Sequence, residues 1–318
     1  MKKKIRVIII LSGISIVALH VINRLITSAA TVKELLAKEK SSYYTWRFGK
    51  IHYKKKGTGK PILLIHDLTA GSSGYEFHKI ENELAKTNEV YTIDLLGYGL
   101  SDKPNITYTN FLYVELITDF IKSVIGKKAD VLTSGDSSSI AIMACHNNAE
   151  IINQIVMVNP QDIGYSKLIP NKKSRLLKWF IELPVVGTFI YNVFYNKKNI
   201  TNSFLNQYYC SAGKIEQTDI DAYVEAAHYA DHSSKYAIAS YLGRYMNISM
   251  IHALSKINNN IYIISGMEKA NAGAITENYL KYNHAIEHHY VESTKQLPHM
   301  ENPEKTLDII QMYLNNSI

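Results

Sequence analysis

Cysteine is scarce in this chain: only Cys145 and Cys210 occur among 318 residues. Two cysteines cannot build a disulfide framework, so a small disulfide-stapled scaffold is excluded. The chain also lacks internal repeats and low-complexity tracts. With 46% apolar residues, a chain of this length is expected to form one large α/β domain with an insertion.

Acidic residues are fewer than basic ones, and the formal net charge is +7. Four of these charges belong to Lys2, Lys3, Lys4 and Arg6 at the N-terminus, which leaves about +3 for the rest of the chain. The excess is therefore local, and nucleic-acid binding is not expected.

A long apolar run follows these four cations. A helix over residues 7–26 rises about 1.5 Å per residue and spans roughly 30 Å, the thickness of a hydrocarbon core. Arg24 can extend toward the far interface. The cationic flank favours a cytoplasmic N-terminus. We therefore expect residues 1–30 to be an uncleaved single-pass anchor in the cell membrane, with the following domain on the outer face.

Two other interpretations of this segment stay open. A cleaved signal peptide would use Ser28 and Ala30 as small residues before the cut, although Arg24 and the length of the apolar run argue against it. A buried core helix is the other, and the cations before the run disfavour it.

Strand-like and helix-like segments alternate after a polar linker, residues 31–42, that we expect to be helical. A hairpin around Gly49 comes first. A continuous apolar strand is expected at 61–66, and further strands at 89–94, 129–133, 155–159, 261–266 and 288–292. This alternation predicts βαβ units and a mostly parallel, doubly wound sheet over residues 43–318.

The rhythm breaks over about residues 160–258, which contain short helical stretches and no strand of similar quality. We interpret this stretch as a helical cap inserted into the α/β domain. Its tyrosines suit an apolar cleft with a hydrogen-bonding rim, although codon bias would also enrich tyrosine. They include Tyr208, Tyr209, Tyr223 and Tyr229.

The segment 131–139, VLTSGDSSS, has the small-x-Ser-x-small pattern of a nucleophile elbow. In such an elbow a tight turn from strand to helix lifts one hydroxyl above a parallel sheet. Gly135 and Ser139 would be the small residues on either side of Ser137. We therefore expect the Ser137 hydroxyl to open into a cleft under the cap.

Four landmarks in order resemble the α/β-hydrolase superfamily, in its capped single-domain branch. They are PILLIHD at 61–67, DLLGYGLSDKP at 94–104, GDSSS at 135–139 and LPHMENPE at 297–304. The resemblance implies an α/β-hydrolase fold over residues 43–318. It also implies Ser137 as the nucleophile and the backbone N–H groups of Leu68 and Ser138 as the oxyanion hole. A dehalogenase is disfavoured, because its nucleophile would be Asp at position 137.

Three positions depart from the family pattern. Asp67 stands where the family usually has glycine, and it adds a carboxyl group beside the oxyanion hole. Lys269 stands at the acid position and Gln296 at the base position, and a glutamine cannot take up a proton. Loss of the histidine costs a serine hydrolase up to about a millionfold in turnover.

Few residues could substitute for the missing partners. His299 lies three residues beyond Gln296 and could be a displaced base, although a structural histidine is the favoured interpretation. Glu268 lies one residue before the acid position, and a solvated loop carboxylate is favoured for it. The remaining candidates are Asp162 as an acid, and Lys269 or Lys295 as the base of a Ser-Lys pair.

A metal site is a weak alternative. His228 and His232 are four residues apart on one expected helix face, together with Glu225. His288 and His289 are adjacent in an expected strand and point to opposite faces, so they cannot share an ion. A solvated cap helix is the favoured interpretation, and no metal or cofactor is expected.

Two functions remain open. One is a membrane-anchored esterase-like or lipase-like serine hydrolase that uses Ser137 on a small or lipid-like substrate. The other is a pseudoenzyme that retains the fold and cleft to bind a ligand or a partner.

Overall fold

An eight-stranded sheet forms the centre of the domain in this computed structural model, which describes residues 2–38, 40–230 and 233–315. The strand order is β1-β2-β4-β3-β5-β6-β7-β8. β1 pairs with β2 and β2 with β4 in antiparallel fashion, and the other neighbours are parallel. The strands are β1 (Ser42–Trp46), β2 (Gly49–Lys56), β3 (Lys60–Ile65), β4 (Asn88–Ile93), β5 (Ala129–Ser134), β6 (Ile152–Val158), β7 (Asn260–Gly266) and β8 (Glu287–Val291).

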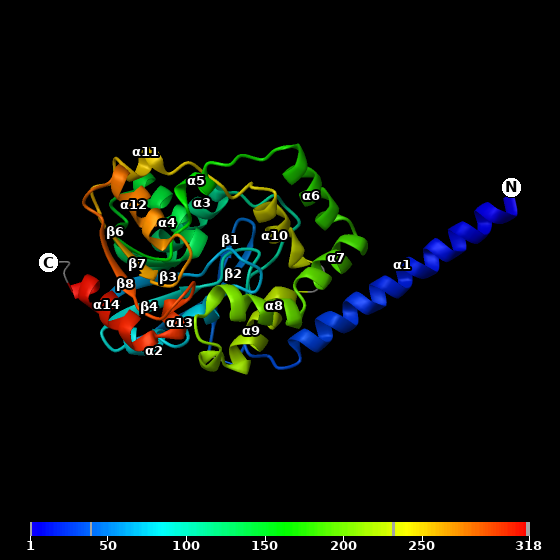
Figure 1. Ribbon diagram of the computed structural model, residues 1–318, viewed down its shortest axis with the longest axis horizontal. Coiled ribbons are helices and arrows are strands. Elements are labelled where there is room, and N and C mark those ends of the chain that lie inside the picture. The colour runs from blue at the N-terminus through cyan, green and yellow to red at the C-terminus, as the bar shows by residue number, and fades with distance from the viewer. Residues whose placement is uncertain (1, 39, 231–232, 316–318) are drawn as a thin grey trace.

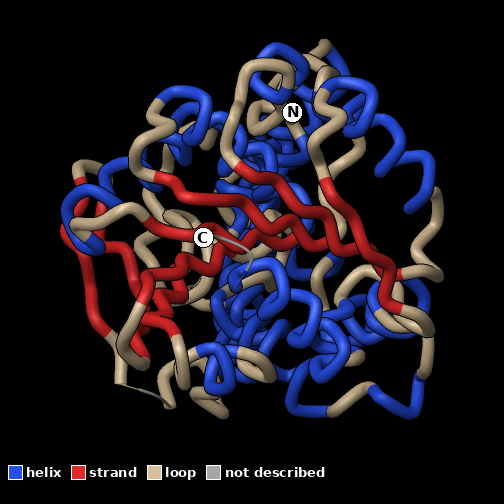
Figure 2. The backbone as a smooth tube through the Cα atoms, turned by 90° about the vertical axis from the view of Figure 1, so that its left-hand side faces the viewer, coloured by secondary structure: helices blue, strands red, loops and turns tan. Residues whose placement is uncertain are grey.

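Helices cover both faces of the sheet, as Figure 2 shows. Ile62 and Leu64 of β3 belong to one apolar cluster, while Leu63 and Ile65 belong to another, because successive side chains of a strand point to opposite faces. A central parallel strand is therefore apolar at every position. The flanking helices are α2 (Glu81–Leu84), α3 (Asn110–Phe120), α4 (Ser138–Asn147), α12 (Ala272–Tyr282), α13 (Pro298–Glu301) and α14 (Pro303–Asn315), with the short helices η1 (Gly74–Phe77), η2 (Ile121–Ile125) and η3 (Gly135–Ser137).

Between β6 and β7 the described residues form helices, turns and loops, which we call the cap (Figure 1). Its helices are α5 (Ile163–Ser166), α6 (Lys172–Glu182), α7 (Val186–Phe194), α8 (Lys197–Ser203), η4 (Phe204–Tyr208), η5 (Ala212–Lys214), α9 (Gln217–His228), α10 (Lys235–Leu242) and α11 (Ile251–Leu254). The predicted fold class is confirmed: a mostly parallel sheet with an inserted helical cap.

The N-terminal helix α1 (Lys2–Thr31) projects away from the domain (Figure 1). It is long and apolar enough to cross a membrane. Its C-terminal part contacts the cap, where Asn23 donates a hydrogen bond to the Val185 carbonyl and accepts one from Asn192.

The expectation of a helical linker over residues 31–42 is wrong for the described part, because α1 ends at Thr31 and turns and loop follow it. The Glu225 carboxylate on α9 accepts hydrogen bonds from the backbone N–H groups of Leu35 and Leu36. These tertiary partners replace the helical hydrogen bonds that the local sequence favoured. Lys33 also pairs with Asp221 on α9, so the linker is attached to the cap.

Candidate functional site

The turn after β5 has the geometry of a nucleophile elbow, with Gly135 at its tip. β5 ends at Ser134, and Gly135 follows in the left-handed region with φ +58°. The short helix η3 then leads into α4, which begins at Ser138. In a nucleophile elbow, the nucleophile occupies this strained position between strand and helix. The residue in this position is glycine, which has no side chain to react.

Ser137 lies two residues further on and is completely buried. Its hydroxyl is 2.8 Å from the Ser134 carbonyl oxygen and 3.1 Å from that of Ile65. The expectation that this hydroxyl opens into a cleft is therefore wrong. A serine in the first turn of a helix can satisfy its hydroxyl on a nearby carbonyl, and Ser137 does so inside the core.

The Asp67 carboxylate occupies the oxyanion hole. Its Oδ1 accepts hydrogen bonds from the backbone N–H groups of Leu68 at 2.7 Å and Asp136 at 2.8 Å. An oxyanion hole combines the amide after the nucleophile with an amide from the loop after the first long parallel strand. The expected Leu68 amide therefore lies in this hole. The expected Ser138 amide does not, because it donates to carbonyls of its own turn, and the Asp136 amide takes its place.

The ring of His66 holds the loop that carries Asp67. Its Nε2 accepts a hydrogen bond from the Leu95 backbone N–H at 3.0 Å, so its Nδ1 carries a proton toward the Asp67 carbonyl at 2.6 Å. This histidine is completely buried between two strand ends. It fixes the path of the backbone and therefore the direction of the Asp67 side chain.

Three carboxylates lie close together at this site. Burial raises the pKa of Asp67 well above its usual range, and the neighbouring charges of Asp136 and Glu76 raise it further. Burial also raises the pKa of Asp136, although a 2.7 Å hydrogen bond from the Tyr241 hydroxyl opposes that shift. Glu76 accepts a hydrogen bond from the Asp67 backbone N–H.

Lys269 is the cation that faces these acids. Its ammonium group donates to the Asn159 carbonyl at 3.1 Å. Burial lowers the pKa of Lys269, while the charges of Asp67, Asp136 and Asp162 raise it. The family's acid position therefore holds a half-buried cation whose charge opposes that of the Asp67 cluster.

Asn159 joins the loops that carry the acid and base positions. Its side-chain amide donates to the carbonyls of Lys295 and Gln296 at 2.8 Å each, and its oxygen accepts from the Gly266 N–H. Gln296 is half-buried in this loop. The loop positions of a triad are therefore preserved, but they carry an amide, Gln296, and an amine, Lys269, instead of an imidazole and a carboxylate.

His299, the candidate displaced base, is completely buried on α13. Its ring stacks on Phe77 at a centroid distance of 5.4 Å, and neither nitrogen has a hydrogen-bond partner among the described residues. Burial lowers the pKa of His299 to about 3. It is therefore a neutral core side chain that is not bonded to Ser137.

The other candidates lie apart from the elbow. Glu268 is exposed, and its backbone N–H bonds the Thr294 carbonyl. Asp162 caps α5 by accepting a hydrogen bond from the Tyr165 N–H. Lys295 is half-buried, and its ammonium group is 3.5 Å from the Asn206 carbonyl.

The possible metal ligands on α9 also have other partners. Glu225 binds the linker backbone, and His228 Nδ1 is 2.8 Å from the Val224 carbonyl. His232 lies outside the described residues. In the ranges that are described, no three His, Cys, Asp or Glu side chains are grouped to hold a metal ion.

A cavity of about 180 Å³ separates the oxyanion loop from the cap. Thr69 and Ala70 of the oxyanion loop line it, together with Tyr241 of the cap helix α10, whose hydroxyl bonds Asp136 in the elbow. The other lining residues come from the cap segment α7–α9: Phe194, Tyr195, Asn199, Ile200, Ser203, Gln207, Tyr208 and Tyr223. The volume is below that of most small-molecule sites, and five of the eleven lining residues are aromatic.

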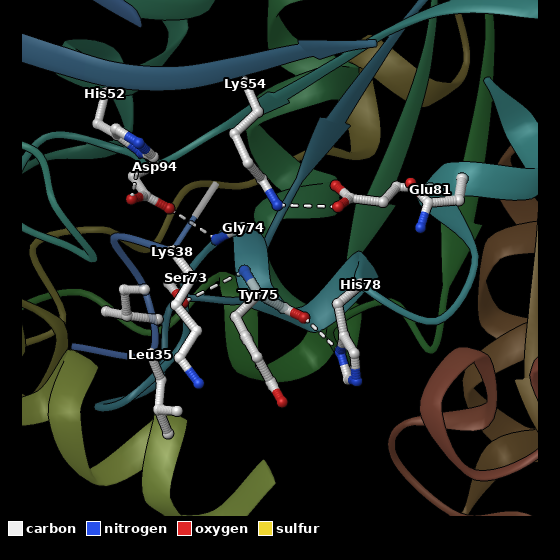
Figure 3. Close-up of a pocket in the computed structure, with 12 residues that line it drawn as sticks. Leu35, Lys38, His52, Lys54, Ser73, Gly74, Tyr75, His78, Glu81 and Asp94 are labelled. Atoms are coloured by element: carbon white, nitrogen blue, oxygen red, sulfur yellow. Dashed lines mark hydrogen bonds and ion pairs between the residues drawn. The ribbon is translucent and has the colours of Figure 1, made fainter. Parts of the chain in front are cut away.

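A second pocket, of about 350 Å³, lies between the linker and β2 (Figure 3). Leu35 and Lys38 of the linker line this pocket together with His52, and His52 pairs with Asp94 at 2.8 Å. None of the residues that line this pocket belongs to the elbow. Asp94 also accepts hydrogen bonds from the backbone N–H groups of Gly74, at the start of η1, and of Leu100, in the loop after β4, which indicates a structural role.

Sequence reasoning missed Gly135 as the tip of the elbow and Asp67 as the occupant of the oxyanion hole. The small-x-x-x-small pattern fits residues 133–137 as well as 135–139, with Gly135 instead of Ser137 at the centre. The end of β5 selects the first register. A glycine that tolerates positive φ immediately after a strand was the available signal.

Comparisons with known proteins agree with this fold. A model of the alpha/beta hydrolase family matches residues 62–309. The 2-hydroxy-6-oxo-6-(2'-aminophenyl)hexa-2,4-dienoic acid hydrolase of Metapseudomonas resinovorans is 30% identical over 134 residues, which cover 39% of this chain and 46% of that enzyme. The 2-hydroxymuconate semialdehyde hydrolase of Pseudomonas sp. (strain CF600) is 22% identical over 111 residues, 34% of this chain and 39% of that enzyme. The matched regions thus span less than half of these relatives.

Two solved structures are similar over most of the chain. A serine hydrolase involved in carbazole degradation has a TM-score of 0.70 at 16% identity, covering 87% of this chain and 98% of its own. A membrane phospholipase A, described as a bacterial virulence factor, has a TM-score of 0.67 at 19% identity, covering 100% of this chain and 99% of its own. At these identities the likeness concerns the fold. Because the family model matches residues 62–309, most of the chain, the chain belongs to the alpha/beta hydrolase family.

Proposed function

We propose that this chain is a membrane-anchored binding protein that uses the α/β-hydrolase scaffold without covalent serine catalysis. The observation that carries the proposal is the position of Asp67 Oδ1, which accepts both N–H groups of the oxyanion hole directly beside Gly135. A substrate carbonyl would have to displace a buried carboxylate from this hole. It would then find no side chain at position 135 to attack it.

The size of these losses supports the proposal. In a serine hydrolase, loss of the nucleophile or the histidine lowers turnover by about a millionfold. The residual activity of roughly a thousandfold over water comes from the oxyanion hole and substrate binding. Here the hole is filled, Gln296 replaces the histidine, and Lys269 replaces the acid.

The alternative is a serine hydrolase that uses Ser137. The small-x-Ser-x-small pattern and the hydrolase names of the relatives favour it. The burial of the Ser137 hydroxyl against two backbone carbonyls counts against it, since an attacking hydroxyl needs access to substrate and a nearby base.

The proposed ligand is small or lipid-like. The cavity under the cap has aromatic walls and a polar rim that includes Asn199, Ser203 and Gln207. Such walls suit an apolar group with one hydrogen-bonding end.

The proposed location is the outer face of the cell membrane, with α1 as a single-pass anchor. The cations at positions 2, 3, 4 and 6 favour a cytoplasmic N-terminus. The likeness to a membrane phospholipase A over the whole chain adds support for a membrane setting.

Activity-based labelling of the purified full-length chain in detergent tests the proposal. We expect no more fluorophosphonate labelling of the native protein than of the Ser137→Ala variant, and no ester turnover above that variant. An active serine hydrolase labelled in the same detergent is the positive control. Rapid labelling that disappears in Ser137→Ala would overturn the proposal and restore the hydrolase function.

A further inference from the structure

Exposed apolar side chains gather on the part of the cap next to α1. Trp179 on α6 is 54% exposed and Phe194 on α7 is 65% exposed. Single exposed apolar residues are ordinary, but many of them on two neighbouring helices, α6 and α7, and on the loop before α6 mark a surface for a partner or a membrane. We call this set the α6–α7 face: Leu168, Ile169, Leu176, Leu177, Trp179, Phe180, Val186, Val193 and Phe194.

Two hydrogen bonds show which part of α1 lies next to the α6–α7 face. Asn23 lies in the last turn of the apolar stretch 7–26, where the anchor would leave the hydrocarbon core. Its side chain bonds the Val185 carbonyl at 3.0 Å and Asn192 at 3.0 Å, at the two ends of α7. α7 therefore lies beside the end of the proposed span, and Figure 1 shows α7 near the lower part of α1, with α6 beyond α7.

Charge distinguishes this part of the chain from the rest. Residues 164–200 contain seven lysines and arginines and one carboxylate, Glu182, which pairs with Lys178. Lys172, Lys173 and Arg175 are exposed at the start of α6. Helices with apolar side chains and lysine or arginine on their exposed surface bind at the boundary between headgroups and acyl chains. Cations near an anionic membrane surface strengthen such binding.

We propose that the α6–α7 face lies in the interface of an anionic membrane, beside α1 and in the same leaflet. This inference rests on the proposed anchoring by α1 and adds a second membrane contact. The two contacts together would fix the orientation of the domain, with the cap toward the lipid. Phe194 belongs both to this face and to the wall of the 180 Å³ cavity, so the cavity would exchange its ligand with the bilayer.

The two tryptophans of the chain provide a direct test. Trp179 is on the α6–α7 face, while Trp46 is 6% exposed and donates a hydrogen bond to Asp119. The full-length protein is reconstituted in vesicles of phosphatidylcholine and phosphatidylglycerol that contain lipids brominated near the top or near the end of the acyl chain. We expect lipids brominated near the top to quench at least a third of the emission, and Trp179→Phe to remove this quenching.

Two further variants separate the face from the anchor, both built on Trp179→Phe. Val17→Trp places a reporter inside the proposed span, and we expect lipids brominated near the chain end to quench it. Phe111→Trp places one at a position on α3 that is 62% exposed but outside the face, and we expect no quenching there.

The variants distinguish a failure of the proposed anchor from a failure of the α6–α7 inference. An unquenched reporter in the Val17→Trp variant would contradict the anchor, and the proposed function with it. Quenching of that reporter together with an unquenched Trp179 in the native protein would overturn the α6–α7 inference alone. In that case a dimer in the same vesicles, detected by cross-linking, would assign the face to a second copy of the chain.

Discussion

The carboxyl group of Asp67 fills the space that a side chain on Gly135 would need. A Cβ atom added to Gly135 would overlap the carboxyl carbon and both carboxylate oxygens of Asp67. Asp67 and Gly135 are therefore coupled: a nucleophile at position 135 requires a smaller residue at position 67. The chain has the opposite combination, in which the acid fills the oxyanion hole and the nucleophile is absent.

This coupling predicts how activity could be restored. Gly135→Ser alone should destabilise the protein by about 1–3 kcal/mol, because it overpacks a buried site. The same substitution combined with Asp67→Gly should fold more stably than Gly135→Ser alone. We expect measurable fluorophosphonate labelling when Gln296→His and Lys269→Asp are added. Thermal unfolding and labelling of the three proteins check this prediction, and labelling of Gly135→Ser alone would contradict it.

Asp67→Asn should stabilise the protein at neutral pH. The raised pKa of Asp67 means that the folded protein holds its proton more tightly than the unfolded chain does. Stability therefore falls as pH rises above about 4 and through the raised folded pKa. Asparagine keeps an oxygen to accept both N–H groups and has no charge to titrate. The difference in unfolding free energy between Asp67→Asn and the native protein should grow by about 1.4 kcal/mol for each pH unit between about pH 4 and the folded pKa of Asp67. It should vanish below about pH 4.

Denaturant unfolding of the native protein and of Asp67→Asn between pH 4 and pH 8 measures this difference. Ser137→Ala serves as a control, because it changes a neighbouring buried group that does not titrate in this range. Lower stability of Asp67→Asn at pH 8 would contradict the assigned role of the charge.

His299 should make the protein sensitive to acid. Its folded pKa of about 3 lies below the usual value of about 6.5, so the unfolded chain binds a proton first as the pH falls. This difference stabilises the folded state above about pH 6.5 and is lost progressively down to about pH 3. At pH 5 the loss is about 2 kcal/mol.

The stability of a His299→Leu variant should not fall in this way between pH 7 and pH 5, because leucine has a similar volume and no proton to bind. Unfolding curves of both proteins at pH 7 and pH 5 check the prediction. The two proteins should differ more in stability at pH 5 than at pH 7, in favour of the variant. Equal changes in both would show that other groups cause the acid sensitivity.

Cys210 offers a test of membrane topology without an added tag. The thiol of Cys210 is exposed, whereas Cys145 is buried. If the domain lies on the outer face, a membrane-impermeant maleimide added to intact cells should label this protein. The Cys210→Ser substitution should abolish the labelling of the protein. Labelling that occurs only after the cells are lysed would place the domain in the cytoplasm.

The fold could be predicted from the sequence because its signals are local. β3 and β7 contain continuous apolar runs, at residues 61–65 and 261–264, and only a strand buried on both faces of a parallel sheet requires such a run. The long apolar helix after a cationic flank was visible for the same reason. The substitutions at Lys269 and Gln296 needed only the spacing of the family's landmarks.

The tertiary structure decided the register of the elbow and the state of the oxyanion hole. The same letters place either Ser137 or Gly135 at the tip, and the choice depends on where β5 ends against its neighbours β3 and β6. Asp67 and Asp136 are 69 residues apart, and their contact forms only when the carboxyl ends of β3 and β5 meet. The attachment of the linker to Glu225 is equally non-local. Such contacts depend on the three-dimensional path of the chain, which no short sequence window contains.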